Sequence, residues 1–259
     1  MADSLDLAFS EVGEGPPLVI LHGLFGSSRN WASHARQLGK SHRVFTLDLR
    51  NHGDSPWAET MSYREMADDV ASFLKRHGLE GATVMGHSMG GKTAMLLALE
   101  QGDLVGRLIV VDIAPVPYSH THLPYIEAMQ AVDLSTVGRR GEVDRLLENA
   151  VPEPGLRGFL LHNLASEAGR LRWRINLDAL GANMDDLIGY PDDLEGLSYA
   201  GPTLFLAGAA SDYVPAAQHS RIRGLFPAAE IDAVADAGHW VHAEQPQAFL
   251  ARIGAFLGI

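Results

Sequence analysis

The sequence has no cysteine among its 259 residues. Disulfides, thiolate metal sites and cysteine nucleophiles are therefore excluded, and a reducing compartment such as the cytoplasm, where we expect the protein, is allowed. Long apolar runs are also missing, because none approaches the roughly 18 residues that a membrane-spanning helix needs. Residues 1–4 lack a basic stretch followed by an apolar one, so no export signal is predicted.

Basic residues are few: 20 Lys and Arg stand against 32 Asp and Glu, which gives a formal charge of −12. This charge repels the phosphates of nucleic acids, and no block of basic residues offsets it. Nucleic acid is therefore not an expected partner. Composition carries no information on the oligomeric state.

Short apolar runs alternate with amphipathic segments of helical period, which is typical of an α/β protein with a parallel sheet covered on both faces. One helix, beginning after Ser62, has Glu65 at the spacing of a capping box. We expect strands at 5–11, 18–21, 44–48, 82–86, 108–112, 203–208 and 230–234. We expect further helices at 30–38, 89–101, 216–225 and 245–257.

This alternation breaks between residues 115 and 198, where no strand-like run is evident and Gly and Pro separate several short helical segments. The strand pattern resumes at Pro202. We therefore predict one core domain, residues 1–115 and 199–259, interrupted by a helical cap at 116–198.

The strongest local motif is Gly86-His87-Ser88-Met89-Gly90, a G-x-S-x-G sequence between an expected strand and an expected helix. This is the setting of a nucleophile elbow, a sharp turn that exposes a serine hydroxyl. Glycine is required on both sides because a side chain there would clash with the tight turn. Ser88 is therefore the candidate nucleophile.

A serine hydroxyl needs a base to take its proton, and histidine is suited to this role near neutral pH. In α/β proteins with a nucleophile elbow, the catalytic residues follow one another in the order serine, acid, histidine, and the histidine comes after the last strand. His239 lies there, on the small-residue turn Ala237-Gly238. His242 is the rival three residues later, and we favour His239.

The acid must end a strand beside the histidine loop so that its carboxylate can accept a hydrogen bond from the imidazole. Two aspartates meet this requirement: Asp112 after strand 108–112, and Asp212 after strand 203–208. The later loop is the usual place, but Ser211 occupies the common acid position and Asp212 comes one residue late. The residues alone leave both candidates open.

Amide groups are expected to hold the negative charge that develops on the substrate oxygen. Met89 offers one at the start of the helix behind Ser88. Leu24, in the loop after an early strand, offers the second, with Phe25 beside it expected to line the substrate site. His22 in the same loop is expected to brace it by hydrogen bonding.

The other charged side chains, and the histidines that could bind a metal, are not expected to take part in catalysis. We expect Lys92 to lie on a solvated basic face, together with the arginines that flank Trp173, although these cations could also attract an anionic leaving group. The arginines are Arg170, Arg172 and Arg174. His120 and His122 form an i, i+2 pair without an evident third ligand, so no metal site is predicted.

Five motifs in order resemble the YbfF/ABHD11-type esterases of the α/β-hydrolase superfamily, over essentially the whole chain. They are HGLFGS at 22–27, DLRNHGDS at 48–55, GHSMGGK at 86–92, VDIAP at 111–115 and GHWVH at 238–242. In that group the residue matching Asp112 carries the acid, which favours Asp112, while the presence of Asp212 departs from the group's pattern.

The resemblance implies an α/β-hydrolase fold and hydrolysis of small-molecule esters, or thioesters such as acyl-CoA, without metal or organic cofactor. Two alternatives stay open. One is a cofactor-free perhydrolase or haloperoxidase on the same residues. The other is a ligand-binding receptor that keeps the pocket without turnover.

Overall fold

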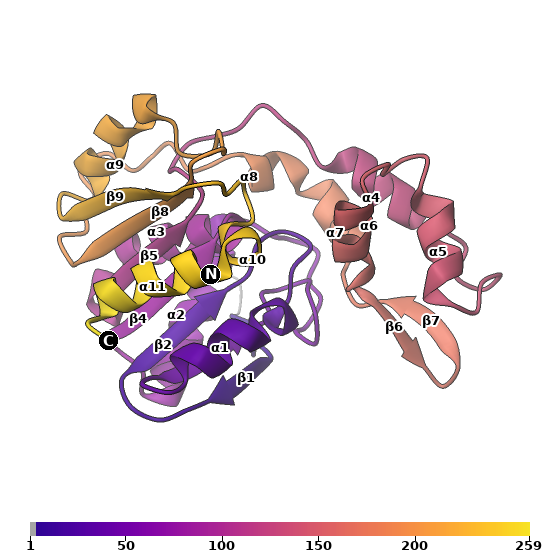
Figure 1. Ribbon diagram of the computed structural model, residues 1–259, viewed down its shortest axis with the longest axis horizontal. Coiled ribbons are helices and arrows are strands. Elements are labelled where there is room, and N and C mark those ends of the chain that lie inside the picture. Colours follow the sequence, from indigo (N-terminus) through magenta and orange to yellow (C-terminus); the bar gives the residue numbers. More distant parts are fainter. Residues whose placement is uncertain (1–3) are drawn as a thin grey trace.

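The computed structural model describes residues 4–259, which form a seven-stranded sheet with the order β1-β3-β2-β4-β5-β8-β9 (Figure 1). Only β1 runs antiparallel to its neighbour within this sheet. The strands are β1 (Phe9–Val12), β2 (Pro17–Leu21), β3 (Arg43–Leu47), β4 (Ala82–His87), β5 (Val105–Val111), β8 (Thr203–Gly208) and β9 (Ala229–Val234). The predicted α/β class is confirmed, and the predicted strand 203–208 has the bounds of β8.

Both faces of the sheet are covered by helices, which explains why its strands are continuous apolar runs. In β2, Leu18 and Ile20 belong to one core cluster, whereas Val19 and Leu21 belong to the other. The first cluster packs against α1 and α11, and the second against α2, α3 and α9. These helices are α1 (Ala32–Leu38), α2 (Tyr63–His77), α3 (Met89–Glu100), α9 (His219–Leu225) and α11 (Pro246–Leu257).

Shorter helical turns connect these elements. They are η1 (Ser28–Trp31), η2 (Gly102–Leu104), η3 (Ala216–Gln218) and α10 (Val241–Glu244). The predicted capping box is present, since the Ser62 hydroxyl accepts from the Glu65 amide and the Glu65 carboxylate accepts from the Ser62 amide. Among residues 4–259, no helix combines the length and apolar character needed to cross a bilayer.

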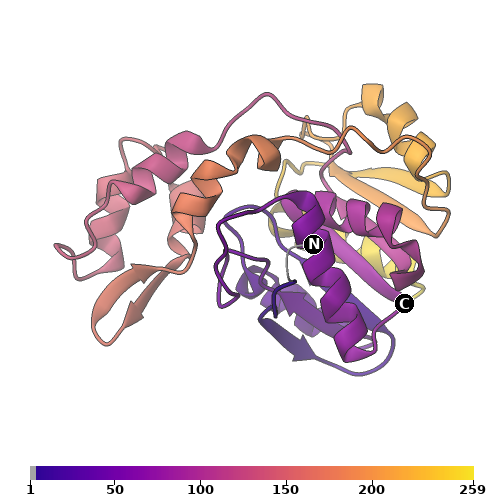
Figure 2. The ribbon, with the colours of Figure 1, turned by 180° about the vertical axis from the view of Figure 1, so that it is seen from behind.

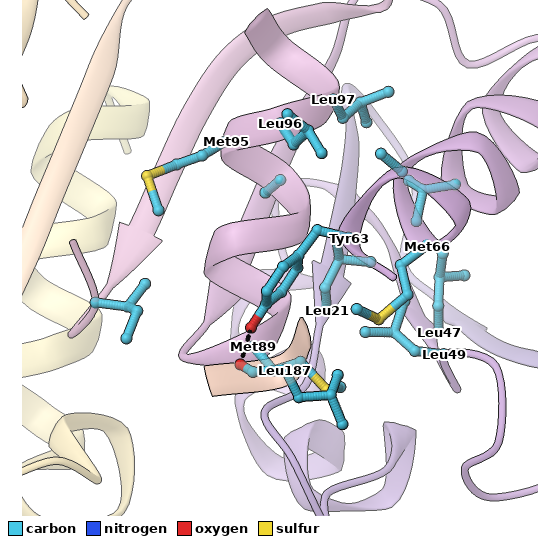
Figure 3. Packing of buried hydrophobic residues seen from close by; sticks show 14 of the residues in the cluster. Leu21, Leu47, Leu49, Tyr63, Met66, Met89, Met95, Leu96, Leu97 and Leu187 are labelled. Atoms are coloured by element: carbon cyan, nitrogen blue, oxygen red, sulfur yellow. Dashed lines mark hydrogen bonds between the residues drawn. The ribbon is translucent and has the colours of Figure 1, made fainter. Parts of the chain in front are cut away.

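The chain between β5 and β8 forms a lobe at one end of the sheet, seen on the right of Figure 1 and from behind in Figure 2. Its helices are α4 (Leu123–Gln130), α5 (Arg140–Leu147), α6 (Pro154–Leu161), α7 (Leu177–Ala182) and α8 (Met184–Ile188). Tyr63 of α2 packs among core side chains and donates its hydroxyl to the Leu187 carbonyl, 2.6 Å away, which ties α8 to the core (Figure 3).

This lobe also contains a hairpin of β6 (Leu164–Glu167) and β7 (Arg170–Trp173), so the expectation of no strand here was wrong. The two turn residues, Ala168 and Gly169, both have positive φ, at 49° and 79°. Positive φ at both positions gives the tight turn that suits a two-residue hairpin. The alternation of charged and apolar residues in β7, interpreted above as a basic surface, is a strand pattern.

Candidate active site

Ser88 lies between β4 and α3 with φ 51° and ψ −117°, a conformation that residues with side chains rarely adopt. A Cβ atom on Gly86 would lie 2.1 Å from the Gly90 carbonyl oxygen, and one on Gly90 would lie 2.6 Å from that of His22. The prediction that these flanking positions require glycine is confirmed. The close packing of strand and helix turns Ser88 out of the sheet.

Asp112 follows β5 and is fully buried. Its Oδ2 atom lies 2.8 Å from His239 Nδ1 and 2.5 Å from the Ser211 hydroxyl, and Oδ1 accepts from the Gly208 amide at 2.9 Å. These donors replace the water that burial removes. Asp212 is exposed and forms no side-chain hydrogen bond or ion pair within residues 4–259. The structure thus brings Asp112, and not Asp212, to His239.

The neighbouring histidines have other surroundings. His242 is buried and stacks on Trp31 with ring centroids 4.3 Å apart, and burial lowers its pKa to about 3. Burial also holds the pKa of His87 well below its ordinary value, and its Nε2 donates to the His239 carbonyl at 2.9 Å. Both rings are therefore neutral at pH 7, and His239 is the one that faces a carboxylate.

Ser88 and His239 open into one cavity of about 350 Å³ between the sheet and the lobe. On the core side its wall includes Leu24 and Phe25. On the lobe side it includes Leu156 and Phe159 from the α6 region and Tyr125 of α4. An apolar wall opposite a serine and a histidine can accommodate the hydrocarbon part of a substrate.

The loop after β2 is a tight turn in which the Gly26 amide donates to the Gly23 carbonyl at 2.9 Å. Phe25 has φ 61°, and its carbonyl accepts from the Asn163 side chain of the lobe at 2.8 Å. Within residues 4–259, the amides of Leu24 and Met89 donate to no protein acceptor. Both residues border a smaller cavity beside Ser88.

His22 braces this loop, as expected from the sequence. The Leu49 amide donates to its Nε2 at 3.0 Å, so the ring proton resides on Nδ1, which donates to the Gly23 carbonyl at 2.8 Å. The side chain is buried, and this burial lowers its pKa. Both nitrogens of the neutral ring are thus used in holding the loop.

The loop after β3 supports the same region. The carboxylate of Asp48 accepts from the Ser28 amide at 2.6 Å and from the Asp54 amide at 2.9 Å. Burial raises the pKa of Asp48, but the nearby His22 imidazole and the hydrogen bonds from the two amides together keep it below its usual value. The DLRNHGDS motif therefore acts as a scaffold behind the Gly23 turn, a role that the sequence did not reveal.

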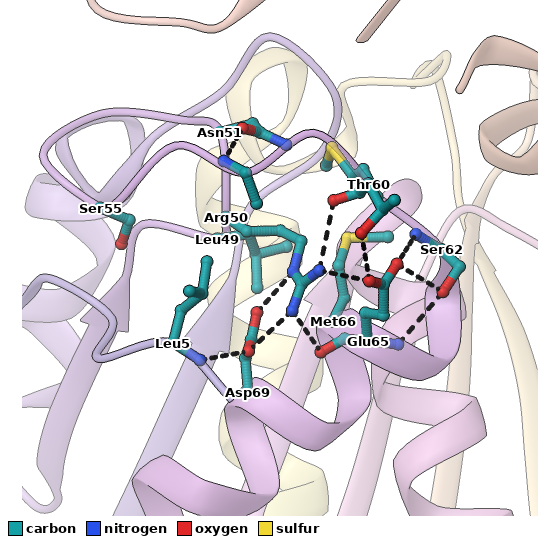
Figure 4. Close-up of polar contacts among 12 residues, drawn as sticks. Leu5, Leu49, Arg50, Asn51, Ser55, Thr60, Ser62, Glu65, Met66 and Asp69 are labelled. Atoms are coloured by element: carbon teal, nitrogen blue, oxygen red, sulfur yellow. Dashed lines mark hydrogen bonds and ion pairs between the residues drawn. The ribbon is translucent and has the colours of Figure 1, made fainter. Parts of the chain in front are cut away.

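A buried ion pair anchors the start of this loop to α2 (Figure 4). The guanidinium of Arg50 makes two hydrogen bonds to the Asp69 carboxylate, at 2.7 and 2.9 Å, and lies 3.0 Å from that of Glu65. Arg50 also donates to the Thr60 carbonyl. The Leu5 amide donates to Asp69 as well. These contacts satisfy charges that would otherwise be costly to bury.

Lys92 does not lie on a solvated face, so that expectation was wrong. Its side chain is 1% exposed and its Nζ donates to the Ile188 and Gly189 carbonyls at the end of α8. The ammonium group also lies 4.8 Å from the centre of the Tyr118 ring. Burial lowers its pKa to about 7. No local pattern indicates acceptors that lie almost one hundred residues further along the chain.

The three arginines around Trp173 do not form one basic surface either. Arg174 is buried and pairs with Asp54 at 2.5 Å, whereas Arg170 and Arg172 are exposed. None of the three lines the cavity around Ser88. Among residues 4–259, no three His, Cys, Asp or Glu side chains gather as a metal site requires.

A family profile described as "alpha/beta hydrolase fold" matches residues 16–156. The chain belongs to the α/β-hydrolase family. A solved α/β-hydrolase, a marine microorganism esterase, is 40% identical and superposes with a TM-score of 0.94, covering 98% of this chain and 100% of the other. The fold and family that the motifs predicted are confirmed.

Two curated relatives extend this likeness. The sn-1-specific diacylglycerol lipase ABHD11 of Mus musculus is 46% identical, covering 93% of this α/β-hydrolase and 81% of the mouse protein. Esterase YbfF of Escherichia coli (strain K12) is 35% identical, covering 93% and 92% of the two chains. The resemblance to YbfF/ABHD11-type proteins is therefore confirmed along nearly the whole chain.

Proposed function

We propose that this α/β-hydrolase is a serine esterase in which Ser88, His239 and Asp112 form the catalytic triad. One observation carries the proposal: the 2.8 Å contact between His239 and buried Asp112, at a cavity that Ser88 also lines. The names of the relatives, which are esterases and a lipase, agree with it.

In the proposed reaction His239 takes the proton of the Ser88 hydroxyl as the oxygen attacks the ester carbonyl. The amides of Leu24 and Met89 donate to the oxygen that becomes negative. His239 then gives its proton to the departing alcohol, and an acyl group remains on Ser88. Water, activated by the same imidazole, releases the acid in a second step.

Asp112 has two tasks in this scheme. Its carboxylate keeps the proton of neutral His239 on Nδ1, so that Nε2 is free to act as the base, and it stabilises the imidazolium that forms. The other donors to Asp112, the Gly208 amide and the Ser211 hydroxyl, hold the carboxylate in place. Asp212, which faces solvent, has no part in the proposal.

Kinetics with p-nitrophenyl esters test the proposal. Ser88→Ala should fold normally and lower kcat by about 10⁵-fold or more, to the residual rate that binding and the amide donors support. Tyr199→Phe provides a matched control, because it removes a buried hydroxyl bonded to the Val105 carbonyl at the far end of β5. An alanine variant with unchanged turnover would contradict the proposal.

A second candidate activity, thioester hydrolysis, is supported by a groove beside the cavity. This groove, of about 630 Å³, shares Asn30, Phe159 and Trp240 with the cavity, and Arg29 and Arg140 line it. Among the described residues that line it, none is Asp or Glu. In a chain of net charge −12, such a groove favours a leaving group that carries phosphate, as in acyl-CoA.

Comparing an acyl-CoA with the p-nitrophenyl ester of the same acid tests this second activity. Arg140→Gln should raise KM for the thioester about fivefold and leave KM for the aryl ester unchanged, because only the thioester carries phosphate. Added salt should reproduce the effect on the wild type. Equal changes for both substrates would contradict the assignment of the groove.

A further inference from the structure

The phenol ring of Tyr213 lies against the imidazole of His239, with ring centroids 4.0 Å apart and an interplanar angle of 23°. Tyr213 comes from the loop after β8, two residues beyond Ser211. The hydrogen bond to Asp112 fixes one atom of the imidazole, Nδ1. That bond alone leaves the ring able to rotate about it, and a stacked aromatic face restricts this rotation.

Tyr213 is itself held by the segment that leads from β5 into the lobe. Its hydroxyl lies 2.9 Å from Nε2 of His120, and its carbonyl accepts from the Tyr118 hydroxyl at 2.6 Å. The Tyr118 hydroxyl in turn accepts from the Ala114 amide at 2.9 Å. Both ends of Tyr213, ring and backbone, are thus attached to one stretch of chain.

This stretch of chain also forms part of the substrate cavity. His120 and Tyr213 line the cavity together with Ser88 and His239. A ligand that fills the cavity therefore contacts the same side chains that hold the imidazole. A small displacement of the imidazole would change the reaction rate, because proton transfer requires the donor and acceptor to be within hydrogen-bond distance.

We propose that Tyr213 is a positioning residue for His239, and that its hydrogen bond to His120 makes the orientation of the imidazole depend on the segment entering the lobe. The inference rests on the proposed function of His239 as the base. Tyr213 takes no proton in the reaction and acts only by holding the ring.

Kinetics of Tyr213→Leu on p-nitrophenyl acetate provide the first test. Loss of the stacked ring should lower kcat about tenfold or more and leave KM within about twofold, since the contacts to this small ester remain. Tyr213→Phe keeps the stacked ring but loses the hydrogen bond to His120, so its kcat should lie measurably between those of Tyr213→Leu and the wild type. A Tyr213→Leu enzyme with wild-type kcat would overturn the inference.

A double-mutant cycle provides the second test and does not depend on the leucine variant folding. Tyr213→Phe and His120→Phe each keep an aromatic ring and remove one partner of the same hydrogen bond. Their effects on kcat should not add, so the double variant should match either single variant. Full additivity would overturn the proposed link between His120 and Tyr213.

Two controls distinguish a failure of this inference from a failure of the proposed function on which it rests. Tyr199→Phe should leave kcat and KM unchanged, which shows that losing a buried tyrosine hydroxyl elsewhere has no effect. Ser88→Ala is measured in parallel. An active Ser88→Ala enzyme contradicts the proposed function itself, whereas an inactive one beside a fully active Tyr213→Leu enzyme contradicts only the role of Tyr213.

Discussion

The hydroxyl of Ser211 donates to Oδ2 of Asp112 over 2.5 Å, and that oxygen is also the one facing His239. Ser211 follows β8 and Asp112 follows β5, which are neighbouring parallel strands. Their carboxyl ends therefore meet at one edge of the sheet. The loop after β8 contributes an alcohol to the acid, while the acid itself comes from the adjacent strand.

Replacing each candidate acid by its amide distinguishes the two. Asp112→Asn should lower kcat/KM for an aryl ester by about 10⁴-fold, because the amide favours the wrong tautomer of His239. Asp212 is exposed and has no side-chain partner among residues 4–259, so Asp212→Asn should stay within about twofold of the wild type. The reverse order of effects would contradict the proposed triad.

The closeness of Ser211 to Asp112 predicts that the carboxylate can be moved. In an Asp112→Asn background, Ser211→Asp should raise kcat/KM about tenfold or more. The side chain of residue 211 already contacts the Asp112 carboxylate, so a carboxylate at residue 211 would lie close to His239. Ser211→Asn in the same background is the matched control and should recover nothing. Equal values for the two double variants would contradict the prediction.

The ion pair between Arg50 and Asp69 should be expensive to break. Both side chains are almost fully buried, so Asp69→Leu leaves the Arg50 guanidinium with Glu65 as its carboxylate partner and should lower the free energy of unfolding by about 3 kcal/mol. Adding Arg50→Met should recover part of that loss. Urea denaturation gives the values, and a double variant less stable than Asp69→Leu would contradict this account.

Lys92 predicts a pH dependence of stability. Its pKa is about 7 in the folded protein and about 10.5 when exposed, because burial disfavours the charged amine. Between these values unfolding takes up a proton, so the free energy of unfolding should increase as the pH rises above 7, by at most about 1.4 kcal/mol per pH unit. Lys92→Met should lack this increase.

Urea denaturation of both proteins at pH 7 and pH 9 measures this effect. The difference in free energy of unfolding between wild type and Lys92→Met removes the contribution of groups that titrate alike in both. It should shift in favour of the wild type at the higher pH. A difference that does not vary with pH would mean that Lys92 titrates normally despite its burial.

Features set by near neighbours in the chain were predictable. The elbow around Ser88, the capping box at Ser62 and the strand 203–208 each depend on a few consecutive residues. The brace formed by His22 belongs with them, because one of its two partners is the next residue, Gly23. Local pattern and steric requirement determine such features together.

Features that depend on contacts between residues far apart in the chain could not be predicted from local sequence patterns. The choice between Asp112 and Asp212 depends on which strand end the His239 loop approaches; the residues alone left both open, and only the family resemblance favoured Asp112. The burial of Lys92 depends on carbonyls 96 and 97 residues later. The β6–β7 hairpin was not predicted, because the four-residue alternation of arginine with apolar residues in β7 also fits a charged surface.

Mass spectrometry of the enzyme quenched during turnover tests the central claim most directly. With a slowly deacylated p-nitrophenyl ester, the intact protein should gain the mass of one acyl group, and peptide mapping should place that group on Ser88. The adduct should be absent in Ser88→Ala and should form much more slowly in His239→Gln. Turnover with no adduct, or an adduct on another residue, would contradict a covalent mechanism at Ser88.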